Sequence, residues 1–112
     1  MTMPDPPSRY RIYYADLNPT RGSEISKSRP VVVVSMDEMN RNLETVVVCP
    51  LTTSLHSTWR SRIQIRCAGR EAEIAVDQIR TISRLRLGRE VDRLSSEVAS
   101  ELRRLIAEMY GE

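Results

Sequence analysis

The sequence predicts a small, mainly β domain, a partly closed antiparallel barrel followed by one C-terminal helix. Three observations support this fold class. Short apolar or alternating segments fill most of the chain, and one helical pattern stands at its end. The connections are short, which suits antiparallel pairing, because parallel pairs need long crossovers. The length of 112 residues fits a single domain.

The first expected strand covers residues 9–16, which are rich in tyrosine and isoleucine. Period-two alternation places Tyr10, Ile12 and Tyr14 on one face of it. Prolines and glycines then interrupt regular structure, so residues 17–28 should form a loop. Ordered loops of this length tend to carry function.

Two apolar strands follow this loop. PVVVVS, residues 30–35, and TVVVCPLT, residues 45–52, are apolar on both faces. Central strands covered on both sides have this pattern, and Pro50 ends the second one. The intervening residues 37–44 read as a turn or a single helical turn.

The remaining strands are shorter. Residues 60–66 alternate, with two isoleucines inward and Arg60, Arg62, Gln64 and Arg66 outward. Residues 71–79 form another apolar strand, and residues 80–94 hold one or two short strands.

The last segment predicts the one strong helix. Ser95 or Ser96 can cap its N-terminus, Glu97 suits the positive end of the helix dipole, and Gly111 can end it. The apolar residues at helical spacing should pack on the core or on an interface, with no cofactor site: Val98, Leu102, Leu105, Ile106 and Met109.

The N-terminal residues 1–8 contain three prolines and are expected to be a disordered lead-in, followed by one domain over residues 9–112. The chain lacks both the pattern of a secretory signal and a transmembrane stretch, so we expect a cytoplasmic protein without membrane contact.

Composition and motifs exclude several chemistries. Cys49 and Cys67 lie 18 positions apart without a CxxC pair, and His56 is the only histidine. We therefore expect two reduced thiols, no metal site and no cofactor. No nucleotide P-loop, GxSxG or HExxH motif is present.

Two polar features stand at the ends of apolar strands and could meet in a barrel. Arg29 precedes Pro30, and Thr52 ends the next strand. A guanidinium and a hydroxyl together can stabilise a pentacoordinate phosphorane without metal. A purely structural interpretation stays open, in which Arg29 pairs with Glu24 or Asp37 and Thr52 caps a loop.

Four blocks carry a resemblance to a known family. YYADLNPTRGSE, SRPVVVVS, VVVCPLTTS and AVDQIRTIS resemble, in order and spacing, the MazF/PemK family of toxin endoribonucleases, from Tyr10 onward. The resemblance implies an SH3-like barrel with a C-terminal helix, CcdB/MazF-like, working as a homodimer. It also implies sequence-specific, metal-independent cleavage of single-stranded mRNA, and a cognate antitoxin whose disordered tail covers the RNA groove.

The family's motifs carry over residue by residue. Its catalytic arginine matches Arg29 and its catalytic threonine matches Thr52, and its RNA-side block matches Asp77, Gln78 and Arg80. The reaction is attack of the RNA 2′-OH on its own phosphate. We expect Arg29 to stabilise the charge on the phosphate rather than to act as a base, because arginine keeps its proton. Glu24, Asp77 and His56 are candidate proton acceptors, and Glu24 completes the predicted catalytic set.

A wider set is predicted to contact RNA: Lys27, Thr53, Ser54, His56, Trp59, Arg62, Arg66, Asp77, Gln78 and Arg80. Trp59 could equally stack on a base or anchor its loop, whereas the pattern around His56 favours a solvated loop residue over a catalytic one.

Two alternatives differ in function. One is a non-enzymatic, CcdB-like gyrase poison, although that group lacks the Arg-Pro and Leu-Thr-Thr blocks. The other is an inactive relative that keeps only antitoxin binding, suggested by the Ile25-Ser26-Lys27 stretch where many relatives have glycines.

Overall fold

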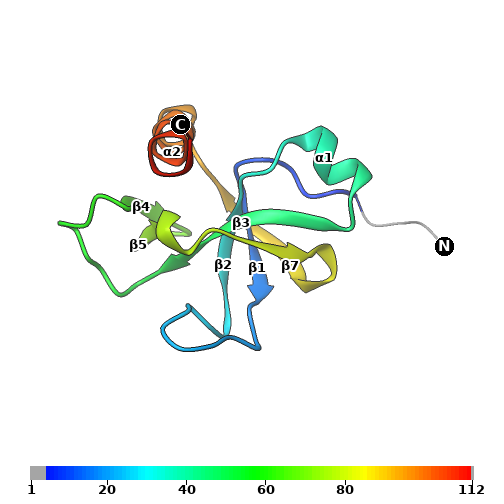
Figure 1. The fold of residues 1–112 in the computed structure, drawn as a ribbon, viewed down its shortest axis with the longest axis horizontal. Coiled ribbons are helices and arrows are strands. Elements are labelled where there is room, and N and C mark those ends of the chain that lie inside the picture. The colour runs from blue at the N-terminus through cyan, green and yellow to red at the C-terminus, as the bar shows by residue number, and fades with distance from the viewer. Residues whose placement is uncertain (1–4, 112) are drawn as a thin grey trace.

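The computed structural model describes residues 5–111 as a curled antiparallel sheet with one long helix at its side (Figure 1). The strand order is β4-β5-β3-β2-β1-β7, and β6 pairs with β3. The elements are β1 Arg11–Asp16, β2 Ser28–Val33, α1 Asp37–Asn42, β3 Thr45–Thr52, β4 Arg62–Cys67, β5 Arg70–Ala75, η1 Val76–Gln78, β6 Arg80–Ser83, η2 Arg84–Arg86, β7 Leu87–Arg93 and α2 Ser96–Tyr110. This confirms the predicted fold class.

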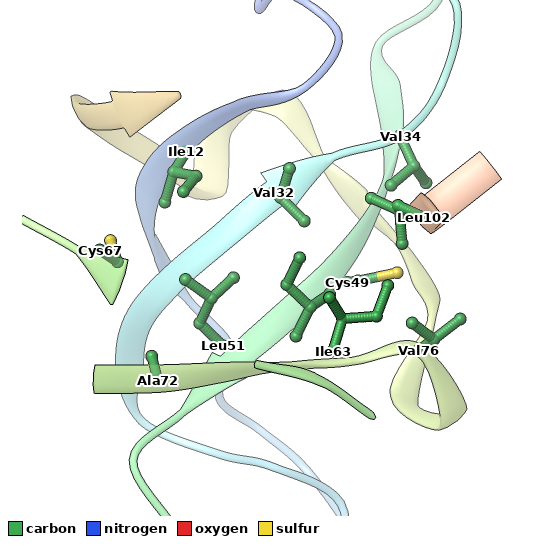
Figure 2. Close-up of a cluster of buried hydrophobic side chains, with 11 residues drawn as sticks. Ile12, Val32, Val34, Cys49, Leu51, Ile63, Cys67, Ala72, Val76 and Leu102 are labelled. Atoms are coloured by element: carbon green, nitrogen blue, oxygen red, sulfur yellow. The ribbon is translucent and has the colours of Figure 1, made fainter. Parts of the chain in front are cut away.

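The central strands β2 and β3 are covered on both faces, as their sequences predict. One face of β2 and β3 sends Val32 and Leu51 into a cluster that also contains Leu102 of α2 (Figure 2). The opposite face sends Val31 and Val48 into a second cluster. Two layers of apolar side chains thus hold the middle of the sheet, and the ends of β2 and β3 are fixed at the rim.

The barrel closes where its edge strands meet. The turn between β4 and β5 uses Ala68 and Gly69, both with positive φ, and the Ala68 N–H donates to Asp92 of β7 at 2.8 Å. Because β4 and β7 end the strand order, this contact bridges the two edges. Pairing of β1 with β7 is irregular on both sides of Tyr13. Along β1, Ile12 is buried and Tyr14 is 41% exposed.

Helix α2 begins as predicted, because the Ser95 hydroxyl accepts from the Val98 N–H. It buries Leu102 against the sheet, while Met109 at its end remains exposed. Gly111 follows the helix with a φ of −83°, so it ends α2 without the left-handed turn that glycine often supplies. Among the apolar residues predicted to pack, Leu102 is therefore the most deeply buried.

Some predicted boundaries need correction. The strand expected over 71–79 ends at Ala75, where η1 begins, whereas residues 80–94 hold two strands as expected, with η2 between them. The last part of the predicted lead-in is ordered. Pro7 is buried, and its carbonyl accepts from the fully buried amide of Asn40. Residues 1–4 lie outside the described residues.

Within residues 5–111, no helix has the length and apolarity required to cross a bilayer.

Candidate active site

Strand register explains how residues far apart in the sequence meet. Val31 of β2 faces Pro50 of β3, and continuing this antiparallel register by two residues places Arg29 opposite Thr52. Thr52 in turn faces Glu73 of β5. Opposed residues point to the same side of a sheet with Cβ atoms about 5 Å apart. Arg29, Thr52 and Glu73 therefore form one row across three strands.

The guanidinium of Arg29 is held without a carboxylate partner among residues 5–111. Its Nε donates to the Ser26 carbonyl at 2.6 Å, and the side chain is half-buried. The two acids considered as partners are engaged elsewhere, because Glu24 accepts from the Arg21 N–H and Asp37 from the Arg9 N–H. The positive charge of Arg29 is thus left for a ligand, and its pairing with Glu24 or Asp37 is wrong.

A cleft of about 510 Å³ opens beside this row. Its floor includes Arg29 and Thr52, and its two walls are the loop before β2 and the loop after β3. The predicted site residues that line it are Glu24, Arg29, Thr52, Ser54, His56, Trp59, Arg62, Asp77 and Gln78. Segments separated by about fifty positions in the chain thereby enclose one concave surface, which is the usual form of a binding site.

One wall is a stacked column of three side chains. The rings of His56 and Trp59 lie parallel, with centroids 3.9 Å apart and an 11° tilt. The guanidinium of Arg62 lies 4.7 Å from the Trp59 ring centre. Thr52 joins this wall to β3, because its hydroxyl oxygen accepts from the Ser54 N–H at 3.1 Å, so the predicted loop cap does form.

A buried carboxylate supports the column from below, and sequence reasoning missed it. Glu73 has no exposed surface, and both of its oxygens accept from the backbone N–H of His56. One of them also lies 4.0 Å from a guanidinium nitrogen of Arg62. The available signal was a glutamate within an otherwise apolar strand, because a carboxylate is seldom buried without partners.

Arg62 lies on the outer face of β4, as its alternation with the core residue Ile63 predicts, but the loop after β3 covers it. Its side chain is only 7% exposed, and its Nε donates to Asp77 at 2.8 Å. Burial alone would raise the pKa of Asp77, but hydrogen bonds from Arg62 and Ser61, with the charge of Arg62, lower it below its ordinary value. Asp77 is therefore a weak proton acceptor.

The opposite wall is formed by residues 17–27. Glu24 closes a local turn with Arg21, and the Ile25 N–H donates to the Gln78 side-chain oxygen at 3.3 Å. Glu24 thus lines the cleft while its carboxylate accepts a hydrogen bond from its own loop.

Four predicted RNA contacts lie outside this cleft. Lys27 and Thr53 line a second hollow on the other side of Arg29 and Thr52. Arg66 is exposed on β4 and donates to the Gly69 carbonyl, and Arg80 donates to the Leu17 carbonyl at 3.4 Å.

Both cysteines are buried and free, as expected. Burial, with a smaller contribution from the Asp77 charge, raises the pKa of the Cys49 thiol to about 12. The described residues contain no group of three or more His, Cys, Asp or Glu side chains placed to hold a metal ion.

Comparison with known proteins shows the family to which this chain belongs. Residues 8–110 match the family described as PemK-like, MazF-like toxin of type II toxin-antitoxin system. The chain belongs to this family. A PemK/MazF-like relative, Endoribonuclease EndoA of Bacillus subtilis (strain 168), is 32% identical over 96 residues, which cover 81% of this chain and 83% of the relative.

Solved structures of PemK/MazF-like proteins share the fold. The crystal structure of MazF from Deinococcus radiodurans superposes with a TM-score of 0.84 at 20% identity, covering 96% of this chain and 98% of the other. An endoribonuclease in complex with its cognate antitoxin, from a mycobacterial species, gives 0.79 at 21% identity and covers 94% and 95%.

Proposed function

We propose that this chain is the toxin of a type II toxin–antitoxin pair and cleaves single-stranded mRNA at specific sequences without a metal ion. The row of side chains across the strands is the main support: Arg29 and Thr52 stand on adjacent strands in the floor of one cleft, and the guanidinium of Arg29 has no carboxylate partner among residues 5–111. The name of the EndoA relative, an endoribonuclease, supports the same activity.

The proposed reaction is a transesterification. The 2′-OH oxygen loses its proton and attacks the adjacent phosphorus while the bond from phosphorus to the 5′ oxygen breaks. The departing 5′ oxygen takes a proton from water, which leaves a 2′,3′-cyclic phosphate and a 5′-OH. Negative charge builds on the non-bridging oxygens in the transition state. Arg29 neutralises this charge, and the Thr52 hydroxyl donates a hydrogen bond to it.

Of the three candidate proton acceptors, we assign the role to His56. The charge of Arg62 and its hydrogen bond favour the ionised form of Asp77, and Glu24 is held within its loop turn. His56 lines the cleft with its ring fixed against Trp59, and histidine is the side chain used most often as a general base. Its replacement by glutamine should lower the rate of RNA cleavage relative to the wild type, as measured by single-turnover kinetics.

Incubation of the purified protein with single-stranded RNAs of varied sequence, in excess EDTA, tests the activity. The wild type should give fragments with cyclic phosphate and 5′-OH ends, and Arg29→Ala should lower the rate by about 10²–10³. Arg41→Ala, on the exposed surface of α1, serves as the matched control and should cleave as the wild type does. Uncut RNA, or full activity in Arg29→Ala, would overturn the proposal.

Growth arrest separates this proposal from the two alternatives. Arrest on expression that Thr52→Ala abolishes would contradict an inactive antitoxin-binding relative. Arrest that persists in Thr52→Ala, with gyrase trapped on cleaved DNA, would favour a gyrase poison.

We also propose a homodimer, which the family resemblance implies. We further propose a cognate antitoxin that covers the cleft, since a structural neighbour is described in complex with its cognate antitoxin. Light scattering after size exclusion tests the first, and competition between the antitoxin and RNA tests the second. The predicted cytoplasmic location stays a prediction.

A further inference from the structure

A second hollow lies on the far side of the Arg29–Thr52 pair. Its volume is about 500 Å³, and Arg29 and Thr52 line it as well as the first cleft. The reacting phosphate would therefore stand between two concave surfaces. A strand of RNA that crosses this point needs space for a nucleotide on each side, and the first cleft supplies only one side.

The floor of this hollow is the open mouth of the barrel. Leu51, Ala72 and Cys67 lie in it, and Figure 2 shows them on the side of the core cluster away from Leu102. The mouth of a β-barrel is a common place for a ligand. Leu51, Ala72 and Cys67 expose only 2%, 7% and 7% of their surface there, so they form a closed apolar floor. A flat, largely apolar group such as a nucleobase fits a floor of this composition.

An aromatic side chain stands beside this floor. Tyr14 of β1 lines the hollow, and it is 41% exposed although it is an aromatic residue within a strand. The guanidinium of Arg89 lies 5.8 Å from the centre of its ring. Proteins that bind single-stranded RNA commonly stack bases on aromatic side chains and on arginine planes.

The rim of the hollow is positively charged. Lys27, Arg29, Arg70 and Arg89 line it, together with Glu71 and Glu90. Glu90 is already paired with Arg11 at 3.2 Å, whereas none of the four cations forms an ion pair among residues 5–111. The surplus of positive charge complements a phosphate backbone.

We propose that this hollow, which we call the second subsite, binds one nucleotide of the RNA that flanks the cleaved phosphate. Its base stacks on Tyr14 above the barrel mouth, and its phosphate contacts Arg89 and Arg70. The volume suits a single nucleotide, since pockets for ligands of this size range over about 300–1,000 Å³. The inference rests on the proposed ribonuclease function, and it adds sequence preference at a position outside the first cleft.

The test uses RNA oligonucleotides around one cleaved site, lengthened or made abasic one position at a time on either side of the cleaved phosphate. For the wild type, removing one particular flanking base should lower kcat/KM by about tenfold or more. Tyr14→Leu should lose this dependence, and Tyr14→Phe, which keeps the ring, should retain it.

Salt dependence tests the charged rim. Arg89→Gln should raise KM and make the slope of log affinity against log salt shallower by about 0.7, the value for one phosphate contact on a single strand. Arg93→Gln, on the same strand but outside the hollow, is the matched control and should change neither. Wild-type kinetics on every oligonucleotide in both Tyr14→Leu and Arg89→Gln would overturn the second subsite, and the proposed ribonuclease would stand.

Cross-linking tests RNA binding at the second subsite without requiring cleavage. An uncleavable 2′-O-methyl oligonucleotide with 4-thiouridine beside the central phosphate is irradiated with the wild type. Adducts at Tyr14 or Arg89 would support the second subsite even if no RNA were cut. Adducts confined to other residues, or no adduct under conditions in which the oligonucleotide binds, would overturn it.

Discussion

The two walls of the cleft are held in different ways. The wall formed by residues 53–61 is fixed from behind, by the buried carboxylate of Glu73 and by Arg62. The wall formed by residues 17–27 is closed at its base by the Leu17 N–H, which donates to the Lys27 carbonyl at 3.1 Å, and its middle is tied to the barrel through Gln78. Figure 1 shows the second wall extending away from the sheet as a long loop.

This difference shows that a binding loop is ordered by the strand that lies beneath it. Both loops are polar and similar in length, but one lies over a strand that offers a buried acceptor, and the other extends past the strand ends. The first wall is therefore preorganised for a ligand. The second depends on local turns and one side-chain hydrogen bond, so a ligand must supply part of its order.

The largest expected effect comes from removing the cation behind the first wall. Arg62→Met leaves the carboxylate of Glu73 buried and without a cation among residues 5–111. Loss of one partner from such a pair should lower the free energy of unfolding by about 3 kcal/mol. Denaturation followed by circular dichroism measures this change, and emission from Trp59 reports the loop itself.

A double-mutant cycle shows whether the effect arises from the pair. Arg62→Met combined with Glu73→Gln should cost less than the sum of the single changes, by about 1 kcal/mol or more. Arg66→Met, four positions along the same strand and exposed, is the matched control and should leave stability unchanged. Simple additivity would show that Glu73 and Arg62 do not act together.

Glu73→Gln alone should have a smaller effect. The amide oxygen can still accept from the His56 N–H, so only the charge is lost, and we expect a decrease of about 1 kcal/mol in the free energy of unfolding. Glu71→Gln, exposed on the same strand, is the control. An unchanged midpoint of denaturation in Glu73→Gln would contradict an anchoring role for its charge.

Gln78→Ala should affect the other wall and leave the barrel nearly as stable. It removes the acceptor of the Ile25 N–H, a hydrogen bond worth about 1 kcal/mol or less. Amide hydrogen exchange should accelerate at Ile25 and its neighbours while the His56 amide remains protected. Gln64→Ala, on the outer face of β4, should change neither amide, and equal acceleration in both loops would contradict the comparison.

The smallest expected effect depends on pH. The folded pKa of Asp77 is lowered, so its ion pair stabilises the protein above the ordinary carboxylate range, and this contribution is lost as the pH falls through the folded value. Asp77→Asn should therefore be less stable than the wild type near neutral pH, by less than about 1 kcal/mol, and equally stable in strong acid. A difference that persists unchanged in acid would contradict this assignment.

Much of the fold could be predicted because it depends on local pattern. The runs of valine in β2 and β3 indicated strands covered on both sides, and Ser95 indicated the start of α2. The candidate pair Arg29 and Thr52 could be named for the same reason, since each stands at a recognisable strand end. Their roles in RNA cleavage remain proposals.

The errors share one cause, which is that alternation does not reveal what covers a strand. Arg62 and Glu73 alternate with apolar neighbours and were expected to be solvated or were overlooked, yet the loop after β3 folds over them. Pro7 was assigned to a disordered lead-in, yet the amide of Asn40 binds its carbonyl. In each case the partner is distant in the chain.

The sequence by itself determined the strands, the helix and the family, because these follow from periodicity, caps and local motifs. Only the tertiary structure decided which side chains meet. Register between β2, β3 and β5 aligned Arg29 and Thr52 with Glu73, and closure of the barrel left a hollow on each side of them. Register and closure depend on long-range pairing of strands, and no local pattern contains that information.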